Sequence, residues 1–546
     1  MNQPQDPRKP KLQIWLPLLF ALVMALGMYI GNKMQTVSTP GNRIVLRNSG
    51  GKLDQVLRLI QNRYVDSLDA DELSDKALNE LLQQLDPYSS FISAKQYEAV
   101  NQPLEGNFEG IGIEFFKLND TILVVSAISG GPSEQVGLRA GDKIITVEDE
   151  NVAGQNLSND DIISKLRGKK GSKVRVGIKR NGQADLLQFT ITRDKIPIYS
   201  VDVAYMLAPG IGYIKINKFS ATTAEEFRRA FLQLHSLQPL QALVLDLRGN
   251  PGGYLDAAIK IADEFLTDGQ LITYTEGRAQ PRRDFKASRR GMFEAGNLVV
   301  LIDEGSASAS EIVSGAVQDW DRGTIIGRRS FGKGLVQEQF DMRDGSAIRL
   351  TVSRYYTPSG RSIQKPYEQG KNDDDDFTSR VLRGELFSAD SIRLADSTLF
   401  KTALGRPVFG GGGIMPDIFV PADSNKFSAY LNALLNNGTI IQFCYQYADD
   451  QRHEKEAFAN ATQFVDRFTV TDKVIAAMQA FAKTEGITPE KNDKWQADLD
   501  MIRLYLKANI GRQWFGNDAF FPVMHGRDKV VKRAVEEARK KLEVGG

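Results

Sequence analysis

The sequence predicts a multidomain α/β protein with a β-rich domain inserted ahead of its largest domain. Three observations support this fold class. The protein has 546 residues, more than one hydrophobic core usually serves. Residues 105–195 have the pattern of short strands separated by turns, and residues 197–424 alternate apolar strands with apolar helices. Such alternation is typical of an α/β domain with a largely parallel sheet.

The composition excludes several classes of function. The net charge is only +1, so the protein has no electrostatic footprint for nucleic acid. The single cysteine, Cys444, cannot form an internal disulfide and is expected to be a buried small hydrophobe. The histidines, His235, His453 and His525, lie outside the glycine-rich and serine-rich motifs. We therefore expect no metal site, no cofactor and no histidine-based catalytic triad.

Residues 1–48 are expected to form an anchor or signal segment followed by a polar linker. A basic lead precedes an apolar run over residues 14–30, which is at the short limit for spanning a bilayer. Ala25-Leu26-Gly27 also fits a signal-peptide cleavage site, so removal of this segment is the alternative to an uncleaved anchor. We favour the anchor, and both alternatives export the rest of the protein.

Residues 49–99 are expected to form a helical subdomain that serves packing or dimer contact. Apolar side chains at positions 53, 56, 57 and 60 follow a helical period, and the Asp86-Pro87 step ends a second helix. At the other end of the sequence, residues 425–546 are also predicted to be helical. Their last segment, residues 530–542, is amphipathic and charged, and we find no chemistry in it.

The β-rich domain is assigned to residues 100–195. Near its start, Gly110-Ile111-Gly112-Ile113 leads into a predicted strand. Adjacent backbone amides ahead of a strand can hold a carboxylate, and the strand edge can pair with an extended peptide. Alone, this segment does not identify a peptide-binding site.

The largest domain, residues 196–424, contains a serine-rich turn at residues 305–311. This Gly-Ser-Ala-Ser-Ala-Ser-Glu segment follows a β-branched strand and precedes a helical pattern, which is how a nucleophilic hydroxyl is presented at a sheet edge. The start of the helix adds free amide donors for an oxyanion. Ser308 and Glu311 also fit a capping box, so helix capping is the alternative. The residue pattern favours Ser308 only slightly over Ser306 and Ser310.

A lysine motif follows at residues 327–334, Gly-Arg-Arg-Ser-Phe-Gly-Lys-Gly. A serine without a nearby imidazole needs another base, and a lysine kept neutral by desolvation can serve. The interval of 333 − 308 = 25 residues allows one helix and one strand, which would return Lys333 to the sheet edge of Ser308. The motif also matches the front of a phosphate-binding loop. However, Gly334 replaces the required Ser or Thr, and residues 335–337 suggest a strand rather than a helix.

A glycine-rich turn, Asp-Leu-Arg-Gly-Asn-Pro-Gly-Gly at residues 246–253, directly follows another buried-type strand. A Gly-Gly step lets backbone amides approach a ligand closely. Together with the Ala309 amide, the amide of Gly252 or Gly253 could complete an oxyanion hole. The alternative is a sharp turn without a ligand.

In their order along the sequence (residues 110–113, 246–253, 305–311 and 327–334), the four motifs closely resemble those of the carboxyl-terminal processing peptidases, serine peptidase family S41, over about residues 50–420. The resemblance implies a ClpP/crotonase-like α/β core with an inserted PDZ domain that binds substrate C-termini near Gly110, Ile111, Gly112 and Ile113. It further implies a Ser-Lys dyad, with Ser308 as nucleophile and Lys333 as general base. Gln337 would orient the lysine amine, and the amides of Ala309, Gly252 and Gly253 would be the oxyanion donors.

The resemblance also implies an environment and partners. We expect protein substrates with accessible, unstructured C-termini, anchoring in a bacterial inner membrane through residues 14–30, and a catalytic part in the periplasm. The resemblance leaves the oligomeric state open, and a homo-oligomer is one alternative. We hypothesise that Arg167, at the end of the PDZ helix, couples that domain to the catalytic one; a solvated surface arginine is the alternative. The rival function is a catalytically silent peptide-binding scaffold, against which intact Ser308, Lys333 and Gln337 argue.

Overall fold

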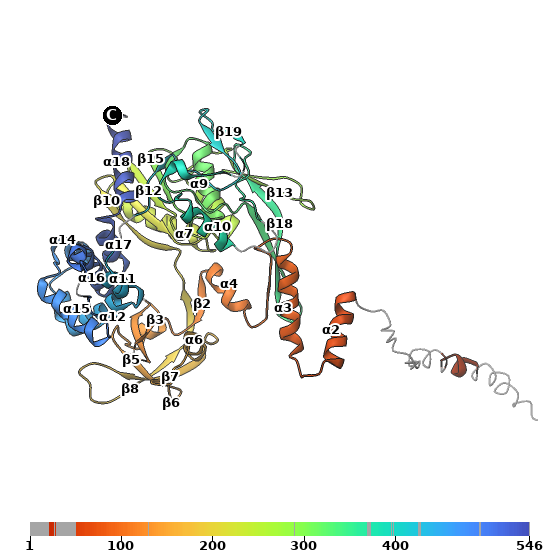
Figure 1. Cartoon of the computed structure of the whole chain (residues 1–546), viewed down its shortest axis with the longest axis horizontal. Helices are drawn as coiled ribbons and strands as arrows, with labels where there is room; N and C mark the ends of the chain where they lie inside the picture. The colour runs from red at the N-terminus through yellow and green to blue at the C-terminus, as the bar shows by residue number, and fades with distance from the viewer. Residues whose placement is uncertain are drawn as a thin grey trace, which may run out of the picture. The chain divides into compact units, whose positions relative to one another are not determined.

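The computed structural model describes most of the sequence after residue 50 (Figure 1). The described residues are 21–26, 28, 51–118, 120–128, 130–288, 290–367, 373–394, 396, 398–423, 427–490 and 493–544. Apart from 21–26 and 28, which are helical, the predicted anchor at residues 14–30 lies outside them. Within this described part, no helix has the length and apolar character needed to traverse a bilayer. The protein divides into two units, residues 1–74 and 75–546.

The predicted helices near the N-terminus are present. The first unit contains α2 (Lys52–Arg63), and α3 (Ala70–Gln83) runs across the boundary between the units. In the second unit, the backbone continues through a short strand, β1 (Ser90–Ile92), and then α4 (Tyr97–Glu105). Strand β1 pairs antiparallel with β18 (Ala347–Tyr356), so this segment contributes to a sheet of the largest domain.

The β-rich domain contains a sheet in the order β3-β4-β5-β7-β8, in which β6 pairs with β5. Among the described strands, β3 pairs only with β4, which leaves its other edge open. Helix α6 contributes Ile162 and Leu166 to the core of this domain, together with Ile111. The elements are β2 (Asn107–Gly110), β3 (Ile113–Leu118), β4 (Thr121–Ala127), α5 (Pro132–Gln135), β5 (Lys143–Val147), β6 (Glu150–Asn151), α6 (Asn159–Leu166), β7 (Lys173–Lys179), β8 (Leu187–Thr192) and β9 (Asp194–Pro197).

The largest domain is built on a six-stranded sheet in the order β10-β11-β12-β15-β16-β21. Within this sheet, β11, β12, β15, β16 and β21 run parallel to one another, and β10 is antiparallel to β11. The central strands are continuous apolar runs because both of their faces are covered. The strands are β10 (Val201–Ala208), β11 (Ile211–Ile216), β12 (Ala242–Asp246), β15 (Asn297–Ile302), β16 (Gly323–Gly327) and β21 (Ile418–Phe419).

One face of this sheet is covered by three helices whose apolar side chains form the main core. These are α7 (Thr223–Leu237), α8 (Leu255–Ala262) and α9 (Ala309–Asp319). The opposite face is covered by α18 (Lys529–Val544), whose Val530, Val531, Ala534 and Ala538 pack against side chains of β11, β12 and β15. Figure 1 shows α18, in blue, beside β12 and β15. These side chains of α18 therefore complete the core of the largest domain, a role that the sequence did not indicate.

A second sheet lies next to this core in the order β1-β18-β13-β14, with β17 paired to β18. Its further strands are β13 (Leu271–Glu276), β14 (Arg283–Lys286) and β17 (Leu335–Asp341). Three shorter elements of this region are α10 (Asp373–Leu382), β19 (Leu399–Lys401) and β20 (Pro407–Phe409).

Residues after 427 form a separate helical cluster before the backbone returns to the sheet. Its members are α11 (Ala429–Asn436), α12 (Thr439–Asp450), α13 (Arg452–Lys455), α14 (Ala461–Arg467), α15 (Asp472–Thr484), α16 (Leu499–Phe515) and α17 (Asn517–His525). Cys444 is a fully buried free thiol in this cluster, as predicted. The cluster contacts the β-rich domain, where the Arg452 guanidinium donates to the carbonyl oxygen of Ala140.

Candidate active site

Ser308 stands at the N-cap of α9, immediately after the loop that leaves β15. Its backbone has φ 54° and ψ −110°, an uncommon conformation for a residue other than glycine and one that is often found at functional sites. The neighbouring Ser306 and Ser310 are fully buried, and their hydroxyls donate to the carbonyl oxygens of Leu247 (2.8 Å) and Asn250 (3.0 Å). Ser308 is therefore the accessible serine of the three.

The capping box expected at Ser308 and Glu311 is present at the start of α9. The Glu311 amide donates to the Ser308 carbonyl oxygen at 2.8 Å, and the Ser308 amide donates to Glu311 Oε2 at 2.8 Å. Helix capping therefore accounts for the position of Ser308 at the start of α9.

Glu311 connects the serine loop with the lysine loop. Its buried carboxylate accepts hydrogen bonds from the amides of Ser308 (2.8 Å), Gly332 (2.7 Å) and Lys333 (2.9 Å), and from the hydroxyl of Ser330. Burial raises the pKa of Glu311 to about 7, although these four donors oppose the rise. The sequence pattern identified Glu311 only as a capping residue, because the partners in the second loop lie about twenty positions away.

Lys333 is partly buried, and the backbone after it leads directly into β17. A phosphate-binding loop would lead into a helix, so the strand agrees with the expectation that disfavoured nucleotide binding. The Lys333 Nζ lies 4.4 Å from the ring centroid of Tyr88. The buried Tyr355 hydroxyl lies 2.7 Å from the Lys333 carbonyl oxygen and 3.1 Å from that of Ser308, which joins the two loops a second time.

The structure brings most of the predicted catalytic residues to one pocket of about 480 Å³. Ser308, Lys333, Gln337, Gly252 and Gly253 all line it. Part of the wall comes from α4, which lies across the expected boundary between the helical subdomain and the β-rich domain. The Gln337 amide nitrogen lies 3.5 Å from the hydroxyl oxygen of Thr351 on β18.

The two glycines of the turn at 246–253 differ in their hydrogen bonding. Gly252 (φ 99°) would place a Cβ 2.8 Å from the Ala307 carbonyl oxygen, and Gly253 (φ 147°) would place one 2.0 Å from that of Phe219, so neither position accepts a side chain. The Gly252 amide donates to Asn250 Oδ1 at 2.8 Å. Within the described part of the protein, the amides of Gly253 and Ala309 have no such acceptor.

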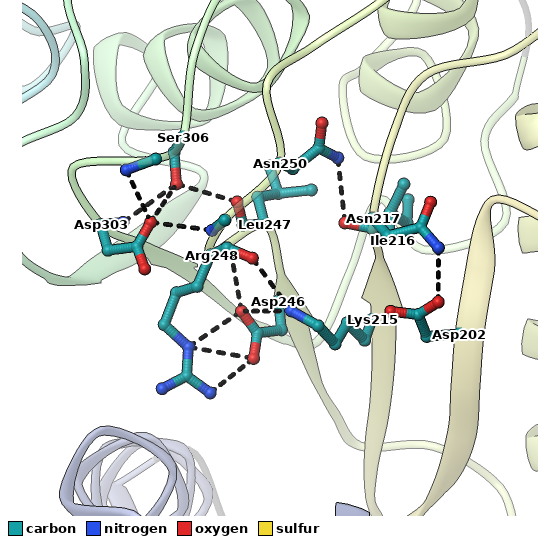
Figure 2. A network of polar contacts seen from close by, with 12 residues as sticks. Asp202, Lys215, Ile216, Asn217, Asp246, Leu247, Arg248, Asn250, Asp303 and Ser306 are labelled. Atoms are coloured by element: carbon teal, nitrogen blue, oxygen red, sulfur yellow. Dashed lines mark hydrogen bonds and ion pairs between the residues drawn. The ribbon is translucent and has the colours of Figure 1, made fainter. Parts of the chain in front are cut away.

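The same turn begins with a second buried carboxylate, Asp246 (Figure 2). It accepts hydrogen bonds from the Arg248 guanidinium (2.6 Å) and from the Tyr213 hydroxyl (2.6 Å), and the Lys215 Nζ lies 3.9 Å away. Burial alone would raise the pKa of Asp246, but the attraction of Arg248 and Lys215 outweighs it and holds that pKa well below its ordinary value. Asp303 then holds the next step of the turn by accepting from the Gly249 amide at 2.8 Å.

The predicted peptide-binding segment, Gly110 to Ile113, runs from the end of β2 to the start of β3 and does not line the pocket of Ser308. Gly112 has φ 72°, and a Cβ there would meet the Ile196 side chain at 2.8 Å. Arg167 is the C-cap residue of α6, and its Nη1 donates to Gln102 Oε1 on α4 at 2.9 Å. Arg167 therefore contacts the helix that walls the pocket. It is not a fully solvated surface arginine.

The buried carboxylates of this region are engaged by donors of the protein itself. Glu311 accepts from three amides and a hydroxyl, and Asp246 accepts from Arg248 and Tyr213. Over the described ranges, no group of three or more His, Cys, Asp or Glu side chains is placed to hold a metal ion.

Comparisons with known proteins assign this sequence to a family. The family model "Peptidase family S41" matches residues 210–374, and "PDZ domain" matches residues 110–192. A carboxy-terminal-processing protease from Bartonella bacilliformis is 38% identical over 317 residues, which are 57% of this chain and 72% of that protein. The chain belongs to the carboxy-terminal processing proteases of family S41.

Three further matches cover different parts of this chain. The carboxy-terminal processing protease CtpB of Bacillus subtilis is 37% identical over 58% of this chain and 65% of its own length, just under two thirds. A solved structure titled photosystem II D1 C-terminal processing protease has 27% identity over 67% of this chain and 92% of its own, with a TM-score of 0.34. Residues 430–516 match "Family of unknown function (DUF8443)".

The comparisons confirm the predicted family and the multidomain α/β fold with a PDZ domain. Sequence reasoning missed three groups of functional interest: Glu311 as a link between loops, Tyr355 as a second link, and the ion pair of Asp528 with Arg248 in the turn at 246–253. Of these groups, only Glu311 carried a signal along the sequence, as a capping residue.

Proposed function

We propose that this protein is a serine endopeptidase of the C-terminal processing type that uses Ser308 and Lys333 as a catalytic dyad. The observation that carries this proposal is the shared pocket of Ser308, Lys333 and Gln337, whose loops are joined by the buried Glu311. Family membership supports it independently.

In the proposed reaction, Ser308 Oγ attacks the scissile carbonyl carbon while Lys333 Nζ, in its neutral form, accepts the hydroxyl proton. The amides of Ala309 and Gly253 stabilise the oxyanion. Collapse of the tetrahedral intermediate breaks the C–N bond, and Lys333 returns the proton to the leaving amine. Water then attacks the acyl-enzyme ester with Lys333 again acting as base, which restores Ser308.

The Lys333 amine must be neutral to act as a general base. Its Nζ lies over the Tyr88 ring at 4.4 Å, and an aromatic face favours the charged ammonium. For catalysis, the amine must lose its proton, and Gln337 is proposed to orient it toward Ser308.

Substrate recognition is proposed to begin at the PDZ domain. The carboxylate of a protein's unstructured C-terminus would bind the backbone at residues 110–113, and the preceding residues would add to the open edge of β3. Arg167, through Gln102, offers a path from this domain to α4 and the pocket.

The cellular setting is likewise proposed from the sequence. The apolar run at residues 14–30 supports tethering to a bacterial inner membrane, with the catalytic part in the periplasm and protein substrates presented there. A homo-oligomer is compatible with this arrangement.

The dyad is tested by replacing Ser308→Ala and Lys333→Ala separately and measuring cleavage of a protein with an unstructured C-terminus. Both variants should lose at least about 10³-fold in kcat while their circular dichroism stays that of the wild type. Lys260→Ala is the matched control, because Lys260 is an exposed lysine paired with Asp256 on α8. An active-site serine probe should label the wild type and not Ser308→Ala.

Full turnover by either dyad variant would refute the mechanism. A wild type that binds C-terminal peptides but neither cleaves them nor reacts with the probe would instead establish the rival function, a peptide-binding scaffold.

A further inference from the structure

The C-terminal segment reaches the turn at 246–253 through an ion pair. The Arg248 Nη1 donates to Asp528 Oδ2 at 2.8 Å, and the two side chains are only 17% and 20% exposed. Figure 2 shows the Arg248 guanidinium directed away from Ser306. Arg248 is thus held between Asp246 of its own turn and Asp528 from a position 280 residues later in the sequence.

Asp528 also caps a helix, a role distinct from its ion pair with Arg248. Its other oxygen, Oδ1, accepts from the amides of Val530 (2.8 Å) and Val531 (3.1 Å), so the residue also caps the start of α18. One carboxylate therefore fixes both the helix that covers the sheet and the guanidinium beneath the turn.

His525 reaches the same carboxylate of the turn indirectly, through the Tyr213 hydroxyl. Its Nδ1 lies 2.5 Å from the Tyr205 hydroxyl, its Nε2 lies 3.5 Å from the Tyr213 hydroxyl, and Tyr213 donates to Asp246 at 2.6 Å. Burial lowers the pKa of His525 to about 4, so the ring is neutral at pH 7. A neutral ring can accept from Tyr205 and donate toward Tyr213, which leaves the Tyr213 proton for Asp246.

The turn transmits these contacts to the serine loop. The carbonyl oxygen of Arg248 accepts from Lys215 Nζ at 2.9 Å. Two residues later, the Asn250 carbonyl oxygen accepts from the Ala307 amide (2.9 Å) and the Ser310 hydroxyl (3.0 Å). Ala307 and Ser310 flank Ser308, so a displacement of the turn would disturb both the proposed nucleophile and the proposed Gly253 donor.

We propose that Asp528 and His525 are positioning residues of the active site, supplied by the C-terminal segment, which hold the Asp246–Arg248 pair and with it the oxyanion side of the pocket. This inference rests on the proposed function. Under this proposal, the residues after 516 position the active site as well as pack against the sheet.

The test is Asp528→Asn in the full-length protein. Asparagine is as good an N-cap as aspartate, so α18 keeps its cap, but the amide loses the charge that holds Arg248. We expect kcat to fall by about ten- to a hundredfold, since small misplacements of catalytic groups cost this much, with KM and the melting temperature near wild type. Binding of a peptide boronate, which forms a tetrahedral adduct with Ser308, should weaken by a similar factor.

Lys529→Ala is the matched control. Its side chain adjoins Asp528 and pairs with Asp423 at 2.6 Å, but both partners are exposed and neither contacts the turn. It should behave as the wild type in all four measurements. Asp528→Glu, which restores the charge, should recover part of kcat.

If Asp528→Asn fails to fold, Tyr205→Phe removes only the hydroxyl that contacts His525 and should lower kcat with unchanged KM. A kcat within twofold of wild type in the folded variant would overturn the inference. So would a variant in which kcat and the melting temperature fall together while KM rises. Failure of the proposed function would look different, because the wild type itself would neither cleave substrate nor react with a serine probe.

Discussion

Two buried carboxylates, Glu311 and Asp246, lie on neighbouring loops of the pocket and hold them by opposite means. Glu311 accepts hydrogen bonds from three backbone amides and one hydroxyl, and its pKa is raised to about 7. Asp246 is paired with Arg248 and Lys215, and its pKa lies well below the ordinary value. Equal burial therefore gives different charge behaviour, because only Asp246 has cations to offset its desolvation.

The two carboxylates should respond to pH in opposite directions. A lowered pKa at Asp246 means that its contribution to stability is present above about pH 4 and is lost as the pH falls through the folded-state pKa. A raised pKa at Glu311 means that stability is greatest below its ordinary value of 4.5 and declines as the pH rises to about 7. The pocket thus combines one carboxylate that favours the charged form with one that resists it.

The largest effect is expected from Asp246→Asn. The substitution keeps the shape but leaves the Arg248 guanidinium with Asp528 as its remaining carboxylate partner. Removing one member of a buried ion pair costs about 3–5 kcal/mol, and the surviving contact should place the loss near the lower end. Urea unfolding at pH 7 measures this.

Combining Asp246→Asn with Asp528→Asn tests whether the two carboxylates share one guanidinium. The double variant should lose more free energy of unfolding than the sum of the single losses. A loss below about 1 kcal/mol in Asp246→Asn would show that the pair contributes little and would remove the contrast with Glu311.

A smaller effect, specific in its pH dependence, is expected from Glu311→Gln. In the wild type, ionising the buried Glu311 should lower the free energy of unfolding by about 2 kcal/mol between pH 5 and pH 8. Glutamine does not ionise, so the variant should lack that decline. Unfolding measured at both values of pH, with Asp246→Asn as the comparison, isolates this contribution; an unchanged slope in Glu311→Gln would contradict it.

The same variant should also lose activity. Glutamine offers one acceptor oxygen where the carboxylate serves four donors, so the serine and lysine loops would separate. We expect kcat to fall at least about tenfold at any pH.

The sequence predicted the parts of this site that are continuous along the backbone. Ser308, Lys333 and the Gly252-Gly253 step each belong to a short motif whose chemistry can be inferred locally. It could not predict that Glu311 joins two loops, that the Gly252 amide is engaged by Asn250, or that Asp528 pairs with Arg248, because these depend on contacts between distant segments. The amphipathic pattern of residues 530–542 did not indicate that α18 covers the sheet of the largest domain.

The smallest effect is expected from Tyr355→Phe, which asks whether Glu311 is the main link between the loops. The ring is fully buried and would keep its place, so only the hydroxyl near the carbonyl oxygens of Ser308 and Lys333 is lost. Removing such a hydrogen bond costs about 1–2 kcal/mol, and kcat should fall no more than about tenfold.

Tyr430→Phe is the matched control for this change. The Tyr430 hydroxyl is also buried, but among the described residues it has no hydrogen-bond partner, so its removal should leave stability unchanged or slightly higher. If Tyr355→Phe lowered kcat as far as Glu311→Gln does, the neutral hydroxyl would hold the loops as strongly as the carboxylate. The two buried acids would then differ in their charge but not in their effect on the active site. A clearly smaller loss of kcat in Tyr355→Phe would instead show that Glu311 sets the spacing of the serine and lysine loops.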